Sequence, residues 1–290
     1  MSYLEYKNYY FIGIGGIGMS AIAEYMLSIN KNIAGYDREE SFSTNRLESL
    51  GIKIINQDIP DYINLKFKDN KKTLVVFTPA ISSSNSILKY FKKNKFKIIK
   101  RSDLLAEVVN SKFCIAIAGT HGKTTTASIL SHILFNSKLK FTSFVGGIIR
   151  GYESNIILNG NKIFLVEADE YDKTFLKINP NIACIINIDG DHYDIYSNIY
   201  DLNKSFIKFT KNLKEGGILF HDSSLDFNGF SFGFDTNSNA QIINLTHTKE
   251  KSIFDIKINE DVFKNVELNM PGTHNAMNAL VAFLIAIELK

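Results

Sequence analysis

The 290 residues are enough for about two domains, and a hydrophobic share of 45% allows both to have buried cores. The net charge of +3 comes from dispersed lysines, which argues against a nucleic-acid-binding surface, and no apolar run reaches the ~18 residues of a membrane span. The amino terminus lacks a signal-peptide pattern, and Cys114 and Cys184 lie singly in apolar runs typical of core thiols. We expect a cytoplasmic protein that binds neither nucleic acid nor membrane.

Strand-like runs alternate with helix-length segments from the amino terminus, which is typical of a parallel α/β sheet. In the first part of the chain the expected strands are 9–14, 32–36, 53–55 and 74–78, and the expected helices are 17–29, 44–50 and 85–92. A connecting helix is expected over 101–110. We therefore predict one α/β domain at residues 1–108 and a second at residues 109–290.

A glycine-rich turn follows the first strand. Residues 13–18 read Gly-Ile-Gly-Gly-Ile-Gly, which matches the G-x-G-x-x-G pattern that brings a diphosphate to a helix N-terminus. Asp37, at the end of the next strand, is placed to accept a ribose hydroxyl, and Thr78 ends a further strand either as a ligand contact or beside a helix cap. A nicotinamide dinucleotide, another nucleotide diphosphate, or glycines that merely allow close packing all remain open. The candidate binding residues are Gly13, Gly15, Gly16, Gly18, Asp37 and Thr78.

The second domain restarts the alternation. Its expected strands are 113–118, 142–145, 162–167 and 182–187, with helices over 123–135 and 202–213. Beyond residue 217, short alternating runs at 218–220, 230–234, 240–245, 253–258 and 262–268 predict antiparallel strands at the edge of the sheet. A final apolar helix begins at His274.

Residues 119–126, Gly-Thr-His-Gly-Lys-Thr-Thr-Thr, lie between a buried strand and a helix. Such a turn can hold phosphates on its backbone N–H groups, with Lys123 neutralising their charge and Thr124 ligating Mg²⁺. Ala118 stands where the usual loop has its first glycine, so a plain strand–helix turn is the alternative. The candidate ATP-binding residues here are Gly119, Thr120, His121, Gly122, Lys123, Thr124 and Thr125.

Acidic residues follow two further strands of this domain. Four carboxylates occur within residues 167–172, and Glu167 is the first after the apolar run, which makes it a candidate Mg²⁺ ligand; an exposed acidic loop is the alternative. His192 is surrounded by acids at the next strand end and is a candidate ligand of a second Mg²⁺. At the last helix, His274, Asn275 and Asn278 share a face that could bind a base or ribose.

Five of these segments together resemble the Mur ligases, in the order and spacing of that family. They are residues 13–20 (GIGGIGMS), 119–126 (GTHGKTTT), 167–172 (EADEYD), 187–194 (NIDGDHYD) and 272–279 (GTHNAMNA). The glycine loop is most similar to the branch that adds L-alanine to UDP-N-acetylmuramate. The resemblance implies a Rossmann-like UDP-sugar-binding domain followed by a P-loop-type ATP-binding domain. The family's third domain, which binds the amino acid, would then lie outside this chain and could be encoded separately.

The resemblance also implies an ATP-dependent ligation. The lactyl carboxylate attacks the γ-phosphate, and the amine of L-alanine then displaces phosphate from the acyl phosphate. Lys123, Glu167 and His192 would be the catalytic residues. Lys123 would contact the β- and γ-phosphates, Thr124 and Glu167 the first Mg²⁺ and His192 the second, with Asn275 and Asn278 at the adenosine. A nicotinamide-dependent oxidoreductase and a non-catalytic nucleotide-binding remnant are the competing hypotheses.

Overall fold

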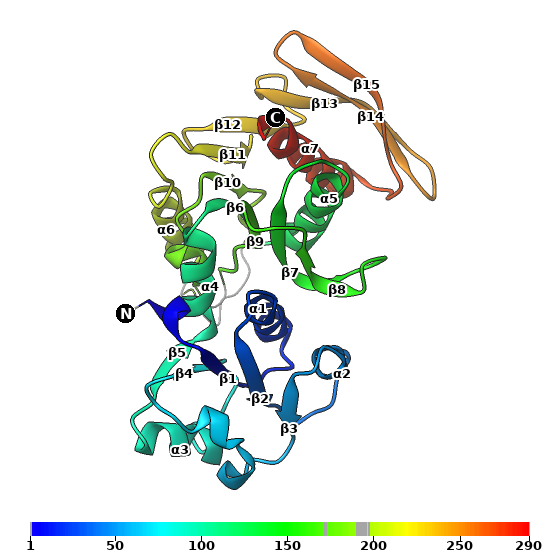
Figure 1. The fold of residues 1–290 in the computed structure, drawn as a ribbon. Helices are drawn as coiled ribbons and strands as arrows, with labels where there is room; N and C mark the ends of the chain where they lie inside the picture. Colours follow the sequence, from blue (N-terminus) through cyan, green and yellow to red (C-terminus); the bar gives the residue numbers. More distant parts are fainter. Residues whose placement is uncertain (1, 171–172, 190–195, 197, 290) are drawn as a thin grey trace. The chain divides into compact units, whose positions relative to one another are not determined.

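The computed structural model describes residues 2–170, 173–189, 196 and 198–289 (Figure 1). By its internal contacts the chain forms two compact units. Unit 1 comprises Met1–Ser111 together with Gly146–Ile156, and unit 2 comprises Lys112–Val145 and Ile157–Lys290. The boundary predicted from the sequence falls after residue 108, and the excursion of residues 146–156 into unit 1 was not anticipated.

Unit 1 is a five-stranded parallel sheet with the strand order β3-β2-β1-β4-β5. The strands are β1 (Asn8–Ile12), β2 (Asn32–Tyr36), β3 (Lys53–Ile55), β4 (Thr73–Phe77) and β5 (Lys97–Lys100). The helices are α1 (Ile17–Ser28), α2 (Phe42–Ser49), α3 (Ser86–Lys93) and α4 (Arg101–Asn110). Strand β5 was missed in the sequence, because its two isoleucines are flanked by lysines and give too short an apolar run.

The register of this sheet brings the ends of three strands together. Ile12 of β1 pairs with Tyr36 of β2 on one side and with Phe77 of β4 on the other. The residues that follow these strands therefore leave the same edge of the sheet side by side. Below that edge, Tyr10 packs against the ring of Phe91 in the core that the sheet forms with α3.

Unit 2 is a ten-stranded sheet with the order β15-β14-β13-β12-β11-β10-β6-β9-β7-β8. Its strands are β6 (Phe113–Ala118), β7 (Phe141–Ile149), β8 (Ser154–Leu158), β9 (Ile163–Glu167), β10 (Ile182–Ile185), β11 (Ile218–Asp222), β12 (Phe230–Gly233), β13 (Ala240–His247), β14 (Ser252–Ile258) and β15 (Asp261–Leu268). Its helices are α5 (Lys123–Phe135), α6 (Ile199–Thr210) and α7 (Thr273–Glu288). The α/β fold class predicted from the sequence, a parallel sheet followed by a sheet with antiparallel edge strands, is confirmed.

Two details of unit 2 differ from the prediction. Strands β11 and β12 pair in parallel and continue the parallel sheet as far as β13, and β14 and β15 are then added antiparallel. An alternation of apolar and polar residues predicts a half-buried strand, but it does not predict whether the strand pairs parallel or antiparallel to its neighbour. Strand β7 also runs on through two glycines and pairs with β8, which the sequence patterns did not reveal.

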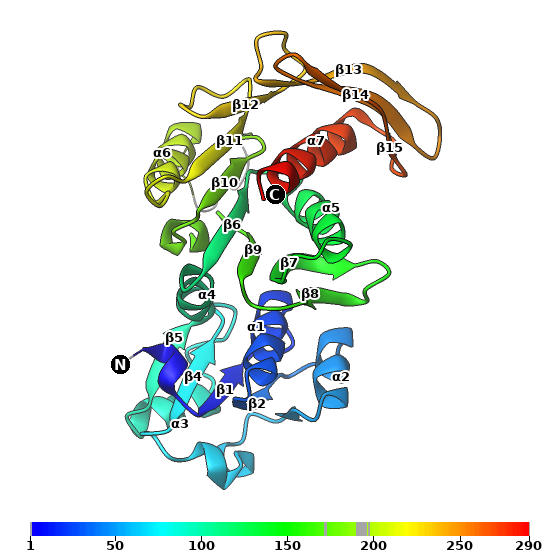
Figure 2. The ribbon, with the colours of Figure 1, turned by 45° about the horizontal axis from the view of Figure 1, so that its top comes forward.

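Helices α5 and α7 lie side by side on one face of this sheet, whereas α6 lies across the sheet from them (Figures 1 and 2). Cys114 in β6 and Cys184 in β10 are buried free thiols, as expected. Burial raises the pKa of the Cys114 thiol to about 12. Across the part of the chain that the structure describes, no helix has both the length and the apolar character to span a bilayer.

Candidate functional site

The glycine loop of unit 1 leads from β1 into α1 and is held in place by backbone contacts. The N–H groups of Gly13 and Ile14 donate to the carbonyl oxygen of Tyr36 at 2.7 and 3.1 Å. A Cβ at Gly15 would lie 2.9 Å from the Oδ2 of Asp37, closer than carbon and oxygen can approach. It would also lie 2.7 Å from the Cγ2 of Thr44, so these two side chains together leave room for a glycine at position 15.

Asp37 positions this loop. Its Oδ2 accepts a hydrogen bond from the Gly15 N–H at 2.7 Å, and its Oδ1 accepts from the Glu39 N–H at 3.2 Å. Both carboxylate oxygens thus bind backbone groups of the protein. The predicted contact with a ribose hydroxyl would have to share these oxygens.

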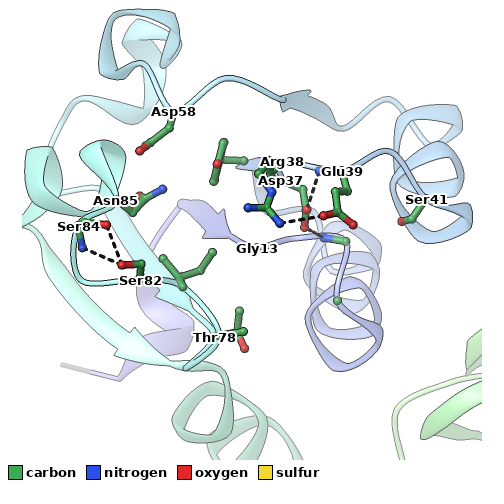
Figure 3. A pocket seen from close by; sticks show the side chains of 15 residues that line it. Gly13, Asp37, Arg38, Glu39, Ser41, Asp58, Thr78, Ser82, Ser84 and Asn85 are labelled. Carbon is green, nitrogen blue, oxygen red and sulfur yellow. Dashed lines mark hydrogen bonds and ion pairs between the residues drawn. The ribbon is translucent and has the colours of Figure 1, made fainter.

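A cavity of about 560 Å³ opens at this edge of the sheet (Figure 3). It is lined by the glycine loop, by the segment after β2 and by the segment after β4. Five of the six predicted residues line it, namely Gly13, Gly15, Gly16, Asp37 and Thr78. Gly18 is outside this lining, because its Cα faces the guanidinium of Arg101.

The lining also includes Ser82 and Ser84, hydroxyls of the segment after Thr78 that the sequence offered as ligand contacts or as a helix cap. Further polar lining residues were not predicted from the sequence, namely Arg38, Glu39, Ser41, Asp58 and Asn85. Asp58 accepts from the N–H groups of Ser86 and Ile87 at 2.7 and 2.9 Å and so helps to cap α3, while Asn85 is the N-cap residue itself. Asp58 follows the edge strand β3 and carried no motif, so only the fold brings it to the cavity.

The phosphate loop of unit 2 leads from β6 into α5. Gly122 is the N-cap of α5 and has a φ of +83°, a left-handed conformation that favours glycine. A Cβ at this position would also lie 2.6 Å from Asn278 Oδ1. The first N–H groups of α5 have no acceptor within the helix, so the turn offers them to a ligand.

Lys123 points into this loop. Its Nζ donates to the carbonyl oxygens of Gly119 and Thr120 at 2.5 and 3.1 Å, and to Glu170 Oε1 at 2.9 Å. The Lys123 side chain is 12% exposed and that of Glu170 is 0% exposed. Such a buried ion pair holds the ammonium in one place. The sequence reading chose Glu167 from the acidic segment and missed Glu170 as the partner of Lys123.

Thr124 and Glu167 lie together at the end of β9. The Thr124 Oγ1 donates to both carboxylate oxygens of Glu167, at 2.9 and 3.0 Å. A hydroxyl and a carboxylate are the hard oxygen ligands that Mg²⁺ prefers, so this pair fits the metal that the resemblance implies. His192, the predicted ligand of a second Mg²⁺, lies outside the described residues. Within those residues, no group of three or more His, Cys, Asp or Glu side chains is arranged so that it could hold a metal ion.

The segment after β10 anchors the apex of the phosphate loop. The side-chain amide of Asn187 pairs with both backbone groups of His121, accepting from its N–H at 2.8 Å and donating to its carbonyl at 3.1 Å. Thr120 donates its N–H to the Asn187 carbonyl, and its hydroxyl accepts from the Asp189 N–H at 3.0 Å. The side chain of His121 is left exposed, and Thr125 is half-buried in the first turn of α5.

The start of α7 holds the three remaining candidate residues. Asn275 donates to the Pro271 carbonyl at 2.7 Å, and His274 is exposed. Asn278 is 5% exposed, and its Oδ1 accepts from the Thr126 hydroxyl at 3.2 Å. Asn278 therefore braces α7 against α5, a packing role that spacing along the helix did not reveal.

Two family models match the chain. The Mur ligase family catalytic domain matches residues 8–113, and the Mur ligase middle domain matches residues 117–286. A UDP-N-acetylmuramate–L-alanine ligase of Christiangramia forsetii is 42% identical over 97% of this chain and 63% of its own length. The chain thus spans under two thirds of that relative, and the same holds for similar ligases of two Flavobacterium species.

Solved structures show the same relationship. A UDP-N-acetylmuramate–alanine ligase of Thermotoga maritima is 25% identical, with a TM-score of 0.83 over 97% of this chain and 65% of its own. A ligase from Neisseria meningitides that acts on UDP-N-acetylmuramate and a tripeptide shares the fold at 22% identity, with a TM-score of 0.86 over 98% of this chain and 94% of its own. The catalytic-domain and middle-domain matches together cover nearly the whole sequence, and the chain belongs to the Mur ligase family.

Proposed function

We propose that this chain provides the UDP-sugar site and the ATP site of a ligase that joins L-alanine to the lactyl carboxylate of UDP-N-acetylmuramate. The observation that carries the proposal is the arrangement around the phosphate loop. There the ammonium of Lys123 is held by Glu170, and Thr124 is paired with Glu167 at the end of a neighbouring strand. The enzyme would act in peptidoglycan precursor synthesis, in the cytoplasm, where both nucleotides are available.

The phosphate loop would bind ATP. The N–H groups at the start of α5 would bind phosphate oxygens, and Lys123 would meet the β- and γ-phosphates from within the loop. Glu170 would keep the ammonium oriented, since it is buried beside it. Asn275 and His274 lie at the exposed start of α7 and would contact the adenosine.

Thr124 and Glu167 would hold Mg²⁺ in place of their mutual hydrogen bond. When bound, Mg²⁺ would offset negative charge on the β- and γ-phosphates. The contribution of these two side chains is to place oxygen ligands beside the loop, at a distance set by the register of β6 and β9. The second Mg²⁺ at His192 stays a prediction.

The cavity of unit 1 would bind the UDP part of the substrate. The start of α1 offers N–H groups to a diphosphate, and the hydroxyls of Ser82 and Ser84 lie on the far side of the opening (Figure 3). Beyond the glycine loop the lining is rich in charged, hydroxyl and amide side chains, which suit a ligand with many hydroxyl and carbonyl groups. This polarity supports a uridine nucleotide over a purely apolar ligand.

The chemistry would proceed by phosphoryl transfer and acyl substitution. The carboxylate oxygen of UDP-N-acetylmuramate attacks the γ-phosphorus, and the bond to the bridging oxygen of ADP breaks. The amine of L-alanine then attacks the acyl carbon, and phosphate leaves as the amine loses a proton. The first step depends mostly on alignment and neutralisation of charge, which the residues of the phosphate loop would supply.

Calorimetric titration tests the two sites separately. We expect one equivalent of UDP-N-acetylmuramate and one of Mg²⁺-ADP to bind, each without excluding the other. Binding of NADH with no binding of UDP-N-acetylmuramate would instead favour an oxidoreductase built on the glycine loop. The ligase activity is tested by phosphate release with ATP, UDP-N-acetylmuramate and L-alanine. That assay is run on the chain alone and with the remaining segment of the Christiangramia forsetii ligase supplied as a second polypeptide.

A further inference from the structure

The hairpin of β7 and β8 connects the two units of the chain in an unexpected way. Its strands begin and end in unit 2, but residues 146–156 make their contacts within unit 1. The chain therefore passes from one unit to the other three times, after residues 111, 145 and 156. Side-chain and backbone contacts hold this hairpin segment, residues 146–156, in unit 1.

The main contact is made by Asn155. Its side-chain Nδ2 donates to the carbonyl oxygen of Ile17 and to the hydroxyl of Ser20, the latter at 3.3 Å. Ser20 in turn donates its hydroxyl to the same Ile17 carbonyl at 2.9 Å. Asn155 is 3% exposed and Ser20 is 4% exposed, so water does not compete for these bonds. Loss of the amide would leave a buried carbonyl and hydroxyl with one fewer partner.

A second contact supports the same segment. Arg46 of α2 forms a two-pronged ion pair with Glu24 of α1, with N···O distances of 2.9 and 2.8 Å. The remaining NH1 of Arg46 donates to the backbone carbonyl of Glu153, next to Asn155 in the hairpin, at 3.5 Å. The paired guanidinium has a fixed orientation, so it restrains the hairpin beside α1.

Asn155 contacts the first turn of α1, which is the part of the helix that would bind a diphosphate. Ile17 is the first residue of α1, directly after the glycine loop, and Ser20 lies one turn further. The N–H groups of this turn are those that would bind the diphosphate of a UDP-sugar. A small rotation of the turn would move them away from the phosphate oxygens, at a large cost in affinity.

We propose that Asn155 is a positioning residue of the UDP-sugar site, contributed by a hairpin of the ATP-binding part of the chain. It holds the first turn of α1 in the orientation that the diphosphate requires. The inference rests on the proposed binding of UDP-N-acetylmuramate to unit 1.

The first test compares Asn155→Ala with the matched control Asn159→Ala. Asn159 lies four residues further on, in unit 2, where its Nδ2 donates to the Leu139 carbonyl. Asn155→Ala should weaken the binding of UDP-N-acetylmuramate about 10-fold, as expected for the loss of a buried hydrogen bond. The affinity for Mg²⁺-ADP should stay within about twofold, and Asn159→Ala should change neither. Equal losses for both ligands, or no loss for either, would overturn the proposal.

A second variant separates positioning from general stability. In Asn155→Asp a carboxylate would face the Ile17 carbonyl, and this repulsion would raise the pKa of the introduced group. Once protonated, the carboxyl carries an O–H that can replace the lost donor. The charged groups on the surrounding elements are Glu24, Arg46 and Glu153, and the first two are paired with each other.

Relative to the unchanged protein, the affinity of Asn155→Asp for UDP-N-acetylmuramate should therefore rise as the pH falls from about 8 to about 5.5. The substrate has no group that titrates in this range, and Asn159→Asp serves as control. The positioning role would be contradicted if the ratio of the two affinities, that of Asn155→Asp to that of the unchanged protein, did not change with pH.

Hydrogen exchange distinguishes a failure of this inference from a failure of the proposed function. In the absence of ligand, the peptides that cover the start of α1 should exchange faster in Asn155→Ala than in Asn159→Ala. If the unchanged protein does not bind UDP-N-acetylmuramate, the proposed function fails and the exchange result alone decides whether Asn155 orders the turn. Identical exchange in both variants would show that it does not.

Discussion

The two glycine loops of this chain have the same layout, a buried strand followed by a turn and a helix, but they are held by groups of opposite charge. In unit 1 the carboxylate of Asp37 accepts the N–H of Gly15. In unit 2 the ammonium of Lys123 donates to the carbonyl oxygens of Gly119 and Thr120. The first loop is thus held through a backbone N–H group, and the second loop is held through backbone carbonyl oxygens.

This difference teaches what each loop can do with phosphate. A carboxylate beside the first loop repels additional negative charge, so a diphosphate with two negative charges suits it better than a triphosphate. The second loop places a cation inside the turn and keeps a carboxylate, Glu167, next to a hydroxyl that can share a metal. That combination suits a triphosphate with Mg²⁺. Five predictions test this contrast.

The largest effect is expected for Lys123→Ala. The affinity for Mg²⁺-ATP should fall about 100-fold or more, since charge-assisted hydrogen bonds to the phosphates are lost. The affinity for UDP-N-acetylmuramate should be unchanged, because Lys123 donates to Gly119, Thr120 and Glu170 within unit 2. Calorimetry of both ligands gives the answer, and an equal loss for both would contradict the division of roles.

A stability control belongs with this variant. Removing Lys123 leaves Glu170 buried without its cation, which should cost about 3–5 kcal/mol of unfolding free energy. The double variant Lys123→Ala with Glu170→Gln should recover most of that stability in urea denaturation. If it also recovered ATP binding, the loss in the single variant would reflect misfolding and not a missing contact.

The second prediction compares one glycine from each loop. Gly122→Ala forces a left-handed φ on alanine and places a methyl 2.6 Å from Asn278 Oδ1, so it should lower the unfolding free energy by about 2–4 kcal/mol. Gly16→Ala is the control, because Gly16 has an ordinary φ of −60° and no atom within 3.5 Å of the added Cβ. Its cost should stay below about 1 kcal/mol. Similar costs at the two positions would refute the assigned strain.

The third prediction concerns the metal. Glu167→Gln should raise the Mg²⁺ concentration needed for half-maximal ATP binding at least about 10-fold, since it replaces a charged ligand by a neutral one. Thr124→Val should act in the same direction, whereas Thr124→Ser keeps the hydroxyl and should resemble the unchanged protein. A Mg²⁺ titration of ATP binding measures all three. An unaltered Mg²⁺ requirement in Glu167→Gln would remove that residue from the metal site.

Much of both loops could be predicted, because their chemistry is local. The strand–glycine–helix order, the left-handed Gly122 and the pairing of Thr124 with Glu167 all follow from contiguous patterns or from strand ends that meet at one edge. The partners contributed by distant segments could not be found in this way. Glu170 is one of four acids within residues 167–172, and spacing alone does not show which one the fold buries.

The excursion of the hairpin had no signal in the sequence either. The strand expected over 142–145 ends just before Gly146 and Gly147, and glycine weakens isolated strands. In the structure β7 continues through them, since pairing with β8 and contacts with unit 1 outweigh the local preference. Asn155 lies in an apolar run and resembles a loop residue until its contacts with α1 are known.

The fourth prediction separates two roles for Asp37. If its carboxylate positions Gly15, Asp37→Ala should lower the affinity for UDP about 10-fold. Asp37→Asn should lower it only about threefold, because an amide oxygen still accepts the N–H of Gly15. UDP and 2′-deoxy-UDP should then lose affinity equally. If Asp37 instead binds the ribose, the variants should lose the preference for UDP over its deoxy form. Titrations with the two nucleotides distinguish the roles, and Mg²⁺-ADP binding serves as the control.

The smallest effect is expected for the two cysteines, both in unit 2. Burial raises the pKa of Cys114 from its ordinary 9.0 to about 12, and that of Cys184 is raised as well. Below pH 9 the thiols stay protonated in both the folded and the unfolded protein. Above pH 9 the unfolded chain loses protons that the folded chain retains, so the free energy of unfolding falls with rising pH. By pH 10 the loss should be about 1 kcal/mol per thiol, measured against Cys114→Ala with Cys184→Ala. The burial of the thiols would be contradicted if they reacted with a disulfide reagent as fast in the native protein as in the urea-unfolded chain. Slow labelling would instead measure how often unit 2 opens.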